Sequence, residues 1–198
     1  MADNSPAIAD PASLGLAGFG MTTFVLSVFN AGILHTTLEG VVLPLTIFYG
    51  GIAQLLAGMW EFKRGNVFGT VAFTSYGAFW LSFYWYVHSI AGGLPAAEAY
   101  KATGLFLLAW TIFTAIMTIA SYALTGVIKT LFTVLLITFI LLTIGVYATG
   151  TGTSLDIWTK IGGWAGIVTA LIAWYGVLGG VTNAAYGKEV IPMFTKKA

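Results

Sequence analysis

Residues 126–149 read GVIKTLFTVLLITFILLTIGVYAT, and Lys129 is the single charged residue in this run. A helix needs about 20 mainly apolar residues to cross the hydrocarbon core of a bilayer. A peptide group without a hydrogen bond in hydrocarbon costs several kcal/mol, so a helix that satisfies its own backbone is the expected structure. The run therefore predicts a membrane-spanning helix.

Five further stretches of the chain share this length and apolar character. They run from about Leu14 to Leu34, Gly40 to Phe62, Asn66 to Ala91, Tyr100 to Leu124, and Trp158 to Tyr186. The alternating segments of roughly ten residues that build transmembrane β-barrels are absent. The sequence predicts an all-α integral membrane protein, a bundle of six transmembrane helices.

The composition excludes several classes of protein. The 198 residues are 58% hydrophobic and 8% charged, whereas a soluble domain carries about 25% charged residues. A net charge of +1 does not suggest a nucleic-acid partner. The absence of cysteine excludes disulfides, zinc thiolate sites and iron–sulfur clusters. Because the segment before the first apolar stretch has no basic region, we do not expect a cleaved signal peptide.

Short turn sequences connect the predicted spans, among them KRGN at 63–66 and GGLP at 92–95. These connections leave no room for a soluble domain. We therefore expect one transmembrane domain at 14–186, an N-terminal segment at 1–13 and a C-terminal tail at 187–198.

The placement of Lys and Arg predicts the orientation, since basic residues concentrate on the cytoplasmic side. If both termini are cytoplasmic, six basic residues lie inside and two outside. The inner set is Lys63, Arg64, Lys129, Lys188, Lys196 and Lys197, and the outer set is Lys101 and Lys160. The distribution favours cytoplasmic termini, with Lys129 also able to lie within its span.

Small and polar residues recur at helical spacing inside the spans. Glycine stripes are typical of packing seams. Asn30 and Gln54 are costly to bury, and either hydrogen bonds between helices or a lined pathway would account for them. Glu61, followed by Lys63 and Arg64, fits a paired interfacial carboxylate and a proton or substrate site equally well.

No catalytic motif is present. The chain contains no H-E-x-x-H, G-x-S-x-G or P-loop pattern, and the two isolated histidines, His35 and His88, do not form a metal or haem centre. We therefore expect neither an enzyme nor a bound cofactor or metal. Spans that carry Asn, Gln, Thr, Tyr and glycine suit the passage of a small solute held by hydrogen bonds.

Two runs resemble a known family. Residues 10–23 read DPASLGLAGFGMTT, and residues 48–54 read FYGGIAQ, a pattern that continues through Glu61 to Trp80. The chain resembles the acetate uptake transporter family, also called the succinate–acetate permease or YaaH-type family. It departs from the family signature N-P-A-P-L-G-L-x-x-F at Asp10 and Ser13, and it has Asn183-Ala184 where the family often has Asn-Glu.

The resemblance implies a function and an assembly. It implies uptake of acetate and other small monocarboxylates, with succinate in some members, through a pathway in each six-helix subunit. It also implies a ring-shaped homo-oligomer, commonly a hexamer, in the cell membrane. Family members are described as proton symporters, and channel behaviour is also proposed.

The resemblance also implies roles for particular residues. Phe19 and Tyr76 match a narrow hydrophobic constriction, and Leu135, with Leu136 as the alternative, matches its third member. Polar pathway residues match Thr22 and Gln54. Asp10 matches an asparagine at the cytoplasmic mouth, where a carboxylate would repel an anion.

The cost of dehydrating a carboxylate explains why a pathway would need polar residues of this kind. A bare carboxylate in hydrocarbon pays several kcal/mol or more in lost hydration. A pathway must therefore supply hydrogen-bond donors or carry the neutral acid, so we expect coupling to protons. The candidate donors are Thr22, Thr23, Asn30, Gln54 and Tyr76. Apolar groups such as Phe19 and Leu135 would meet the methyl group, and Glu61 or Asp10 is a candidate proton or entrance site.

Two alternatives remain open at this level. A channel for small neutral solutes such as urea would share the same lining, and a structural membrane subunit would share the glycine seams. The sequence leaves open the ranking of acetate, propionate, lactate and succinate, and it does not separate a symporter from a channel.

Overall fold

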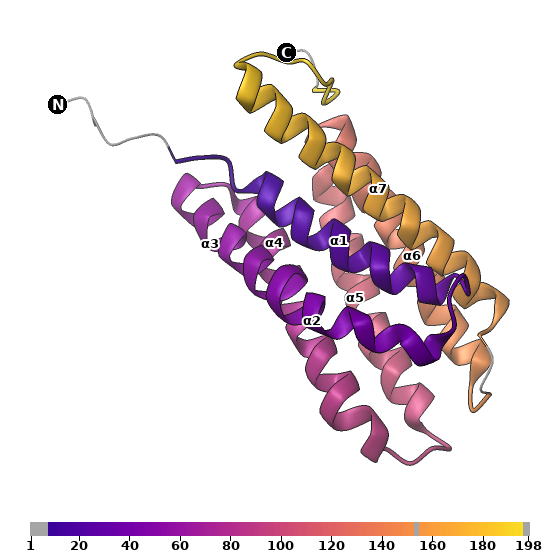
Figure 1. Ribbon diagram of the computed structural model, residues 1–198. Coiled ribbons are helices and arrows are strands. Elements are labelled where there is room, and N and C mark those ends of the chain that lie inside the picture. Colours follow the sequence, from indigo (N-terminus) through magenta and orange to yellow (C-terminus); the bar gives the residue numbers. More distant parts are fainter. Residues whose placement is uncertain (1–7, 153–154, 196–198) are drawn as a thin grey trace.

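The computed structural model describes residues 8–152 and 155–195, and these residues form helices and connecting turns (Figure 1). The seven α-helices are α1 (Ala12–Asn30), α2 (Val42–Ile47), α3 (Gln54–Arg64), α4 (Val67–Trp85), α5 (Ala99–Ser121), α6 (Gly126–Thr149) and α7 (Ile157–Tyr186). Two 3-10 segments, η1 (Thr36–Val41) and η4 (Ala91–Gly93), and two π-helical segments, η2 (Phe48–Ala53) and η3 (Tyr86–Ile90), join them. The expected all-helical class is confirmed.

Five helical segments of the described residues are long and apolar enough to cross a membrane. They are Ala12–Asn30, Thr36–Arg64, Ala99–Ser121, Gly126–Thr149 and Ile157–Tyr186. α4 is not among them, although its 19 residues have the length of a span. Its Ser, Thr, Tyr and Trp side chains lower its hydropathy, so the sixth crossing and the orientation of the termini stay predictions.

The helix boundaries refine the expected spans. The run at Gly126–Thr149 coincides with α6. The first span stops four residues before the predicted Leu34, because α1 ends at Asn30 and Gly32 takes a left-handed φ of 73°, a conformation that glycine adopts without steric cost. The second span is a composite of η1, α2, η2 and α3, and its π-helical segment is of a kind that often occurs at functional sites.

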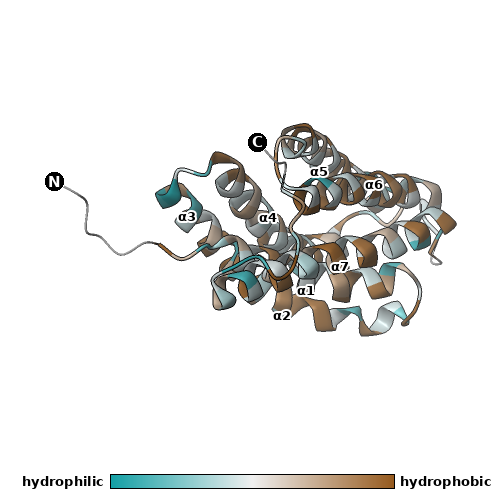
Figure 2. Ribbon diagram, turned by 90° about the horizontal axis from the view of Figure 1, so that it is seen from above, coloured by the Kyte–Doolittle hydropathy of each residue, from teal (hydrophilic) through white to brown (hydrophobic). Residues whose placement is uncertain are grey.

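The helices enclose a common interior. α1 packs along α7, α7 against α6, α6 against α5, and α3 against α4, while α1 also contacts η2 and α3. Figure 2 shows hydrophobic colour along the helices and hydrophilic colour mainly at their ends and turns. Large apolar side chains such as Leu105, Ile116 and Ile119 are exposed on the outside, as expected for surfaces that meet lipid.

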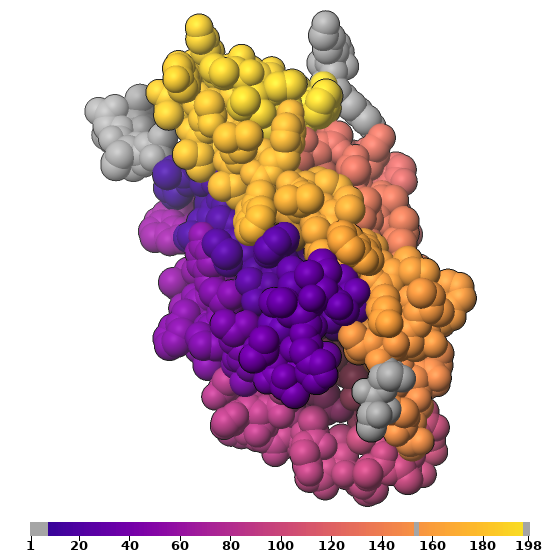
Figure 3. Space-filling model, turned by 45° about the vertical axis from the view of Figure 1, so that its right-hand side comes forward, coloured from indigo at the N-terminus to yellow at the C-terminus, as the bar shows by residue number. Residues whose placement is uncertain are grey.

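Glycines let α1 and α7 approach closely, and the two helices lie side by side on the face in Figure 3. A Cβ atom at Gly163 would collide with backbone atoms of Asn30 and Ala31, and one at Gly166 would collide with Ser27. The expected packing seam therefore exists here, and it sets the position of α1 in the bundle.

The start of α1 and the end of α7 lie at the same end of the bundle, which we call the terminal end (Figure 1). Short connections place Lys63, Arg64, Lys129 and Lys188 there, and they place Lys101 and Lys160 at the opposite end. Lys196 and Lys197 lie outside the described residues, as do the first seven residues of the predicted N-terminal segment.

The seam yields a prediction about stability. We expect Gly163→Ala to destabilise the purified protein by about 1–3 kcal/mol, because overpacking forces backbone shifts. Gly40→Ala is the matched control, since nothing lies within 4 Å of its Cβ position. Thermal unfolding in detergent measures both, and equal midpoints for the two variants would contradict the assigned seam.

Candidate functional site

Three cavities follow one another along the bundle interior. The distal cavity, of about 530 Å³, lies toward the end opposite the termini and is lined by residues that include Thr23, Asn30 and Glu39. The proximal cavity, of about 410 Å³, lies toward the terminal end and is lined by residues that include Glu61 and Asn66. A central cavity of about 20 Å³ lies between them and is lined by Gln54.

Phe19, Tyr76 and Leu135 separate the distal cavity from the central one, and we call these three side chains the neck. Each lines both cavities, and each is at least 94% buried. The rings of Phe19 and Tyr76 meet edge to face with centroids 5.9 Å apart. Thus α1, α4 and α6 each contribute one residue to a neck without charge.

A second apolar layer separates the central cavity from the proximal one. Leu16, Ala72, Phe73 and Phe132 line both of these cavities. The interior is therefore a line of compartments divided by side chains. Apolar partitions of this kind exclude a continuous file of water.

Neighbouring helices fix Tyr76 in the neck. Its hydroxyl and that of Thr114 are 2.8 Å apart and share a hydrogen bond in a buried site. Its ring packs against Phe113 and Phe132 with centroids 5.6 and 6.1 Å away. Because α5 holds the hydroxyl, Tyr76 presents mainly its ring to the cavities.

The two neighbouring threonines of α1 have different environments. Thr23 lines the distal cavity, and its buried Oγ1 has no hydrogen-bond partner. Thr22 lines none of the three cavities, and its hydroxyl donates to the carbonyl of Gly18 at 2.9 Å. The geometry thus brings Thr23 and Asn30 to the cavity and places Thr22 in the packing against Gly50.

Gln54 begins α3 directly after the π-helical segment. Its side chain is 1% exposed, it lines the central cavity, and its Oε1 has no hydrogen-bond partner. An amide can both donate and accept hydrogen bonds. Gln54 therefore supplies a polar group between two apolar layers.

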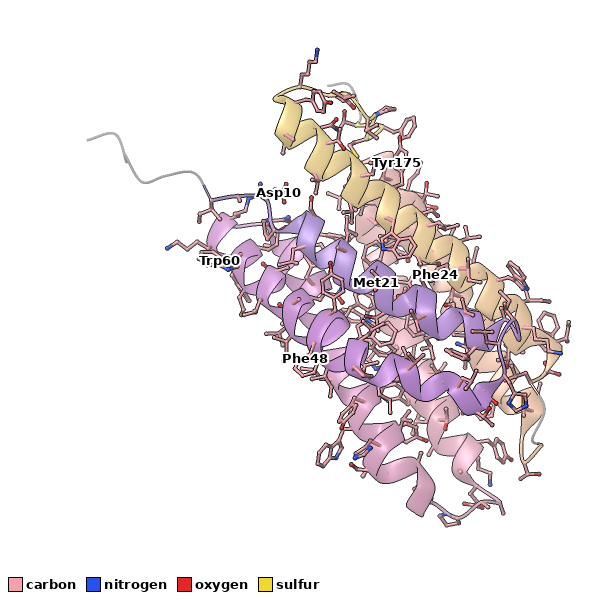
Figure 4. All side chains as sticks on the ribbon, in the orientation of Figure 1. Asp10, Met21, Phe24, Phe48, Trp60 and Tyr175 are labelled. Carbon is pink, nitrogen blue, oxygen red and sulfur yellow. The ribbon has the colours of Figure 1, made fainter. Side chains whose placement is uncertain are left out.

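A carboxylate cluster lies at the terminal end. The Glu61 side chain is fully buried and lines the proximal cavity, its Oε2 accepts a hydrogen bond from Asn66 Nδ2 at 3.0 Å, and its Oε1 has no partner. Arg64 Nη1 lies 3.7 Å from Glu61 Oε2 and 2.7 Å from Asp10 Oδ1. Figure 4 places Asp10 just before α1, where its carboxylate also accepts from the backbone N–H of Ala12.

The ion pair with Arg64 changes the charge expected around Asp10. Arg64 pairs with Asp10 and offsets the negative charge from which we predict repulsion of an anion. Both of these side chains are partly exposed, so solvent screens the pair and its net contribution to stability is small.

The charged side chains that line the three cavities, within the described residues, are Glu39 and Glu61, and both are acidic. No group of three or more His, Cys, Asp or Glu residues there is arranged to hold a metal ion.

Trp80 also lines the distal cavity, and sequence reasoning does not single it out as a site residue. Trp80 is 3% exposed and lines the cavity, and its Nε1 has no hydrogen-bond partner. Trp80 lies one turn beyond Tyr76 on α4, and aromatic residues at this spacing are most often packing. The spacing of four residues from Tyr76 was the available signal.

Comparison with known proteins gives consistent matches. The GPR1/FUN34/yaaH family matches residues 2–194. The succinate-acetate/proton symporter SatP of Escherichia coli is 40% identical over 94% of this chain and 95% of its own length. Acetate permease A of Emericella nidulans is 39% identical over 93% of this chain, and this chain spans 65% of that relative's length. The structure of the bacterial acetate channel SatP matches with a TM-score of 0.84 and 38% identity, over 94% of this chain and 99% of that one.

The Asn66 contact yields a prediction. Asn66 accepts from the Gly69 backbone N–H at 3.1 Å as the N-cap of α4, and it donates to Glu61. Asn66→Asp keeps a good capping side chain but loses the donor to a buried carboxylate. We expect a loss of about 1–3 kcal/mol in unfolding free energy.

Asn66→Ser caps equally well and also removes the donor to Glu61, but it adds no second carboxylate, so it separates loss of the hydrogen bond from charge repulsion. Thermal unfolding compares the two variants. An Asn66→Asp protein that is as stable as the wild type would show that the contact contributes nothing.

Proposed function

Because the chain belongs to the GPR1/FUN34/yaaH family, we propose that it transports acetate and related small carboxylates, succinate among them, across the cell membrane. The observation that carries this proposal is the line of three cavities closed by the apolar neck. The names of the related symporter, permease and channel support it, and they describe transport, not catalysis.

The lining suits a solute with one polar and one apolar end. Thr23, Asn30 and Gln54 offer hydrogen bonds on the two sides of the neck, while Phe19 and Leu135 offer surface to a methyl group. An inorganic anion would gain nothing from these apolar groups. The compartments therefore favour a small organic acid over a bare ion.

Proton coupling is part of the proposal. No Lys or Arg lines any of the three cavities among the described residues, and the two charged lining residues are carboxylates. An anion that reaches the neck meets no Lys or Arg among the described lining residues there and pays its desolvation cost. The neutral acid avoids this cost at the neck, so the transported unit is the anion together with a proton. Glu61, buried at the proximal cavity with a free Oε1, is the candidate for holding that proton.

The proposal includes a membrane arrangement. It takes α4 as the sixth crossing, places both termini in the cytoplasm and makes the proximal cavity the cytoplasmic entrance. The four basic residues described at the terminal end, against two at the other, support this orientation. We also propose the ring-shaped homo-oligomer, a hexamer, that the family resemblance implies, with a separate pathway in each subunit.

Uptake into vesicles tests the coupling. In vesicles that contain the purified protein, we expect the initial rate of labelled acetate uptake to exceed that of protein-free vesicles and to rise when the outside is acidified. A gradient of one pH unit can drive up to about tenfold accumulation with one proton per anion, since it supplies ~1.4 kcal/mol. Protein-dependent uptake that ignores the gradient would reject coupling. Inhibition by urea but not by succinate would favour a neutral-solute channel, and a rate equal to that of protein-free vesicles would favour a structural subunit.

The neck generates a second prediction. Phe19→Ala should widen it and raise the rate for larger acids such as lactate, relative to acetate, by about tenfold, the scale on which an apolar pocket discriminates by size. Phe24→Ala is the matched control on the same helix, because Phe24 packs on Trp174 at 5.1 Å and lines none of the three cavities. If the two variants kept the same selectivity, Phe19 would not belong to the selective constriction.

A further inference from the structure

We propose that residues 188–195, which we call the strap, form a releasable closure that narrows the mouth of the proximal cavity. This inference rests on the proposed transport function. In Figure 1 the strap turns back after α7 and crosses the terminal end of the bundle. Thr195 lines the proximal cavity together with Ala123, Leu124 and Thr125 of the turn between α5 and α6, while no residue of α7 itself lines it. Because Thr195 is also exposed, it lies at the edge of this cavity.

Asn183 of α7 binds the backbone of the strap. α7 ends at Tyr186, and the chain reverses at Gly187, which takes a left-handed φ of 65°. Asn183 Oδ1 then accepts hydrogen bonds from the backbone N–H groups of Val190 and Ile191 at 2.7 and 2.8 Å. Its Nδ2 donates to the carbonyl of Ile191 at 2.8 Å. One side chain therefore supplies three of the hydrogen bonds that hold the strap along α7.

Tyr175 and Gly126 hold the last part of the strap. The Tyr175 hydroxyl donates to the carbonyl of Pro192 at 2.8 Å, and its ring stacks on Phe194 with centroids 6.4 Å apart. The backbone N–H of Gly126, the first residue of α6, donates to the carbonyl of Phe194 at 2.9 Å. The strap thus bridges α7 and α6, and it brings the following Thr195 to the cavity.

Polar contacts hold the strap in place, and little apolar surface is buried with it. Val190 and Phe194 are 44% and 63% exposed. Phe194 has a φ of 53°, in the left-handed region that residues with a Cβ atom seldom adopt. Such backbone persists only where its surroundings hold it, and it clusters at clamps and switch regions. A segment with few buried apolar contacts and exposed hydrogen bonds opens at a low free-energy cost, so the strap can leave while the helices stay packed.

Release of the strap changes the proximal cavity and leaves the neck as it is. Thr195 would leave the cavity edge, and the N–H of Gly126 would bond to water. The neck lies beyond the second apolar layer, between the central and distal cavities. The seated strap therefore slows exchange of a solute between the proximal cavity and water, and the released strap speeds it.

A disulfide that locks the strap onto α7 tests this role. The chain contains no cysteine, so an introduced pair can form only one bridge. Met193 Cγ lies 3.4 Å from the Cβ position of Gly179, which brings cysteines at these two positions within reach of a disulfide. We expect the Gly179→Cys/Met193→Cys protein in vesicles to take up acetate several-fold more slowly when oxidised than after reduction. Each single-cysteine variant is the control and should show no difference between the two conditions.

Thiol labelling measures release without transport. Ala72 is 3% exposed and lines the proximal and central cavities, so a reagent from the terminal end reaches Ala72→Cys through the proximal cavity. In lipid nanodiscs, we expect added Asn183→Ala to raise the labelling rate by roughly tenfold, the equivalent of about one net hydrogen bond. Tyr175→Phe removes one hydrogen bond to the strap and keeps the stacked ring, so it should raise the rate less.

The outcomes separate the strap from the transport function. Equal labelling of Ala72→Cys with and without a folded Asn183→Ala change would overturn the strap, whatever the uptake rate. A cross-linked protein that takes up acetate equally fast before and after reduction would also overturn it, and this measurement serves where Asn183→Ala does not fold. Strap-dependent labelling in a protein whose uptake equals that of protein-free vesicles would support the closure and overturn transport.

Discussion

Every peptide group that enters hydrocarbon needs a hydrogen bond from its own chain, and the rest of this structure depends on that constraint. It makes each apolar stretch a helix. The peptide groups of a helix bond to one another, so they are not free to bind a solute. Where the helix is irregular, at η2, the chain carries Gly50 and Gly51 and then Gln54. The irregular turn lies beside the neck and brings Trp80 and Thr22 close to Gly50.

Close packing of these helices produces the line of three cavities separated by apolar side chains. Gly163 and Gly166 let α7 approach α1, and α1 then carries Phe19 against Tyr76 of α4. The same packing supports the aromatic wall around Tyr76, whose hydroxyl is held by Thr114. The neck is therefore a property of three helices fixed by their neighbours, and its width follows from their spacing.

The charges of the lining residues determine how the cavities interact with a carboxyl group. Glu39 and Glu61 are the charged residues that line the cavities within the described part of the chain, and Arg64 bridges Glu61 and Asp10 beside the proximal cavity. Thr23 and Gln54 add polar groups without formal charge to the linings of the distal and central cavities, and in the proposed function they hold the carboxyl group. This arrangement favours the neutral acid at the neck and the ionised form beside it.

The sequence by itself determined the helical class, the span at Gly126–Thr149 and the family, because apolar length and ordered motifs are local properties of a chain. It also singled out Phe19, Tyr76 and Leu135, which the structure brings together, and Thr23, Asn30 and Gln54, which line the cavities. Only the tertiary structure separated Thr22 from Thr23, paired Asp10 with Arg64 and left the Trp80 N–H free. Those outcomes depend on which helix faces which neighbour, and the rotation of a helix that is apolar on all sides cannot be read from its own residues.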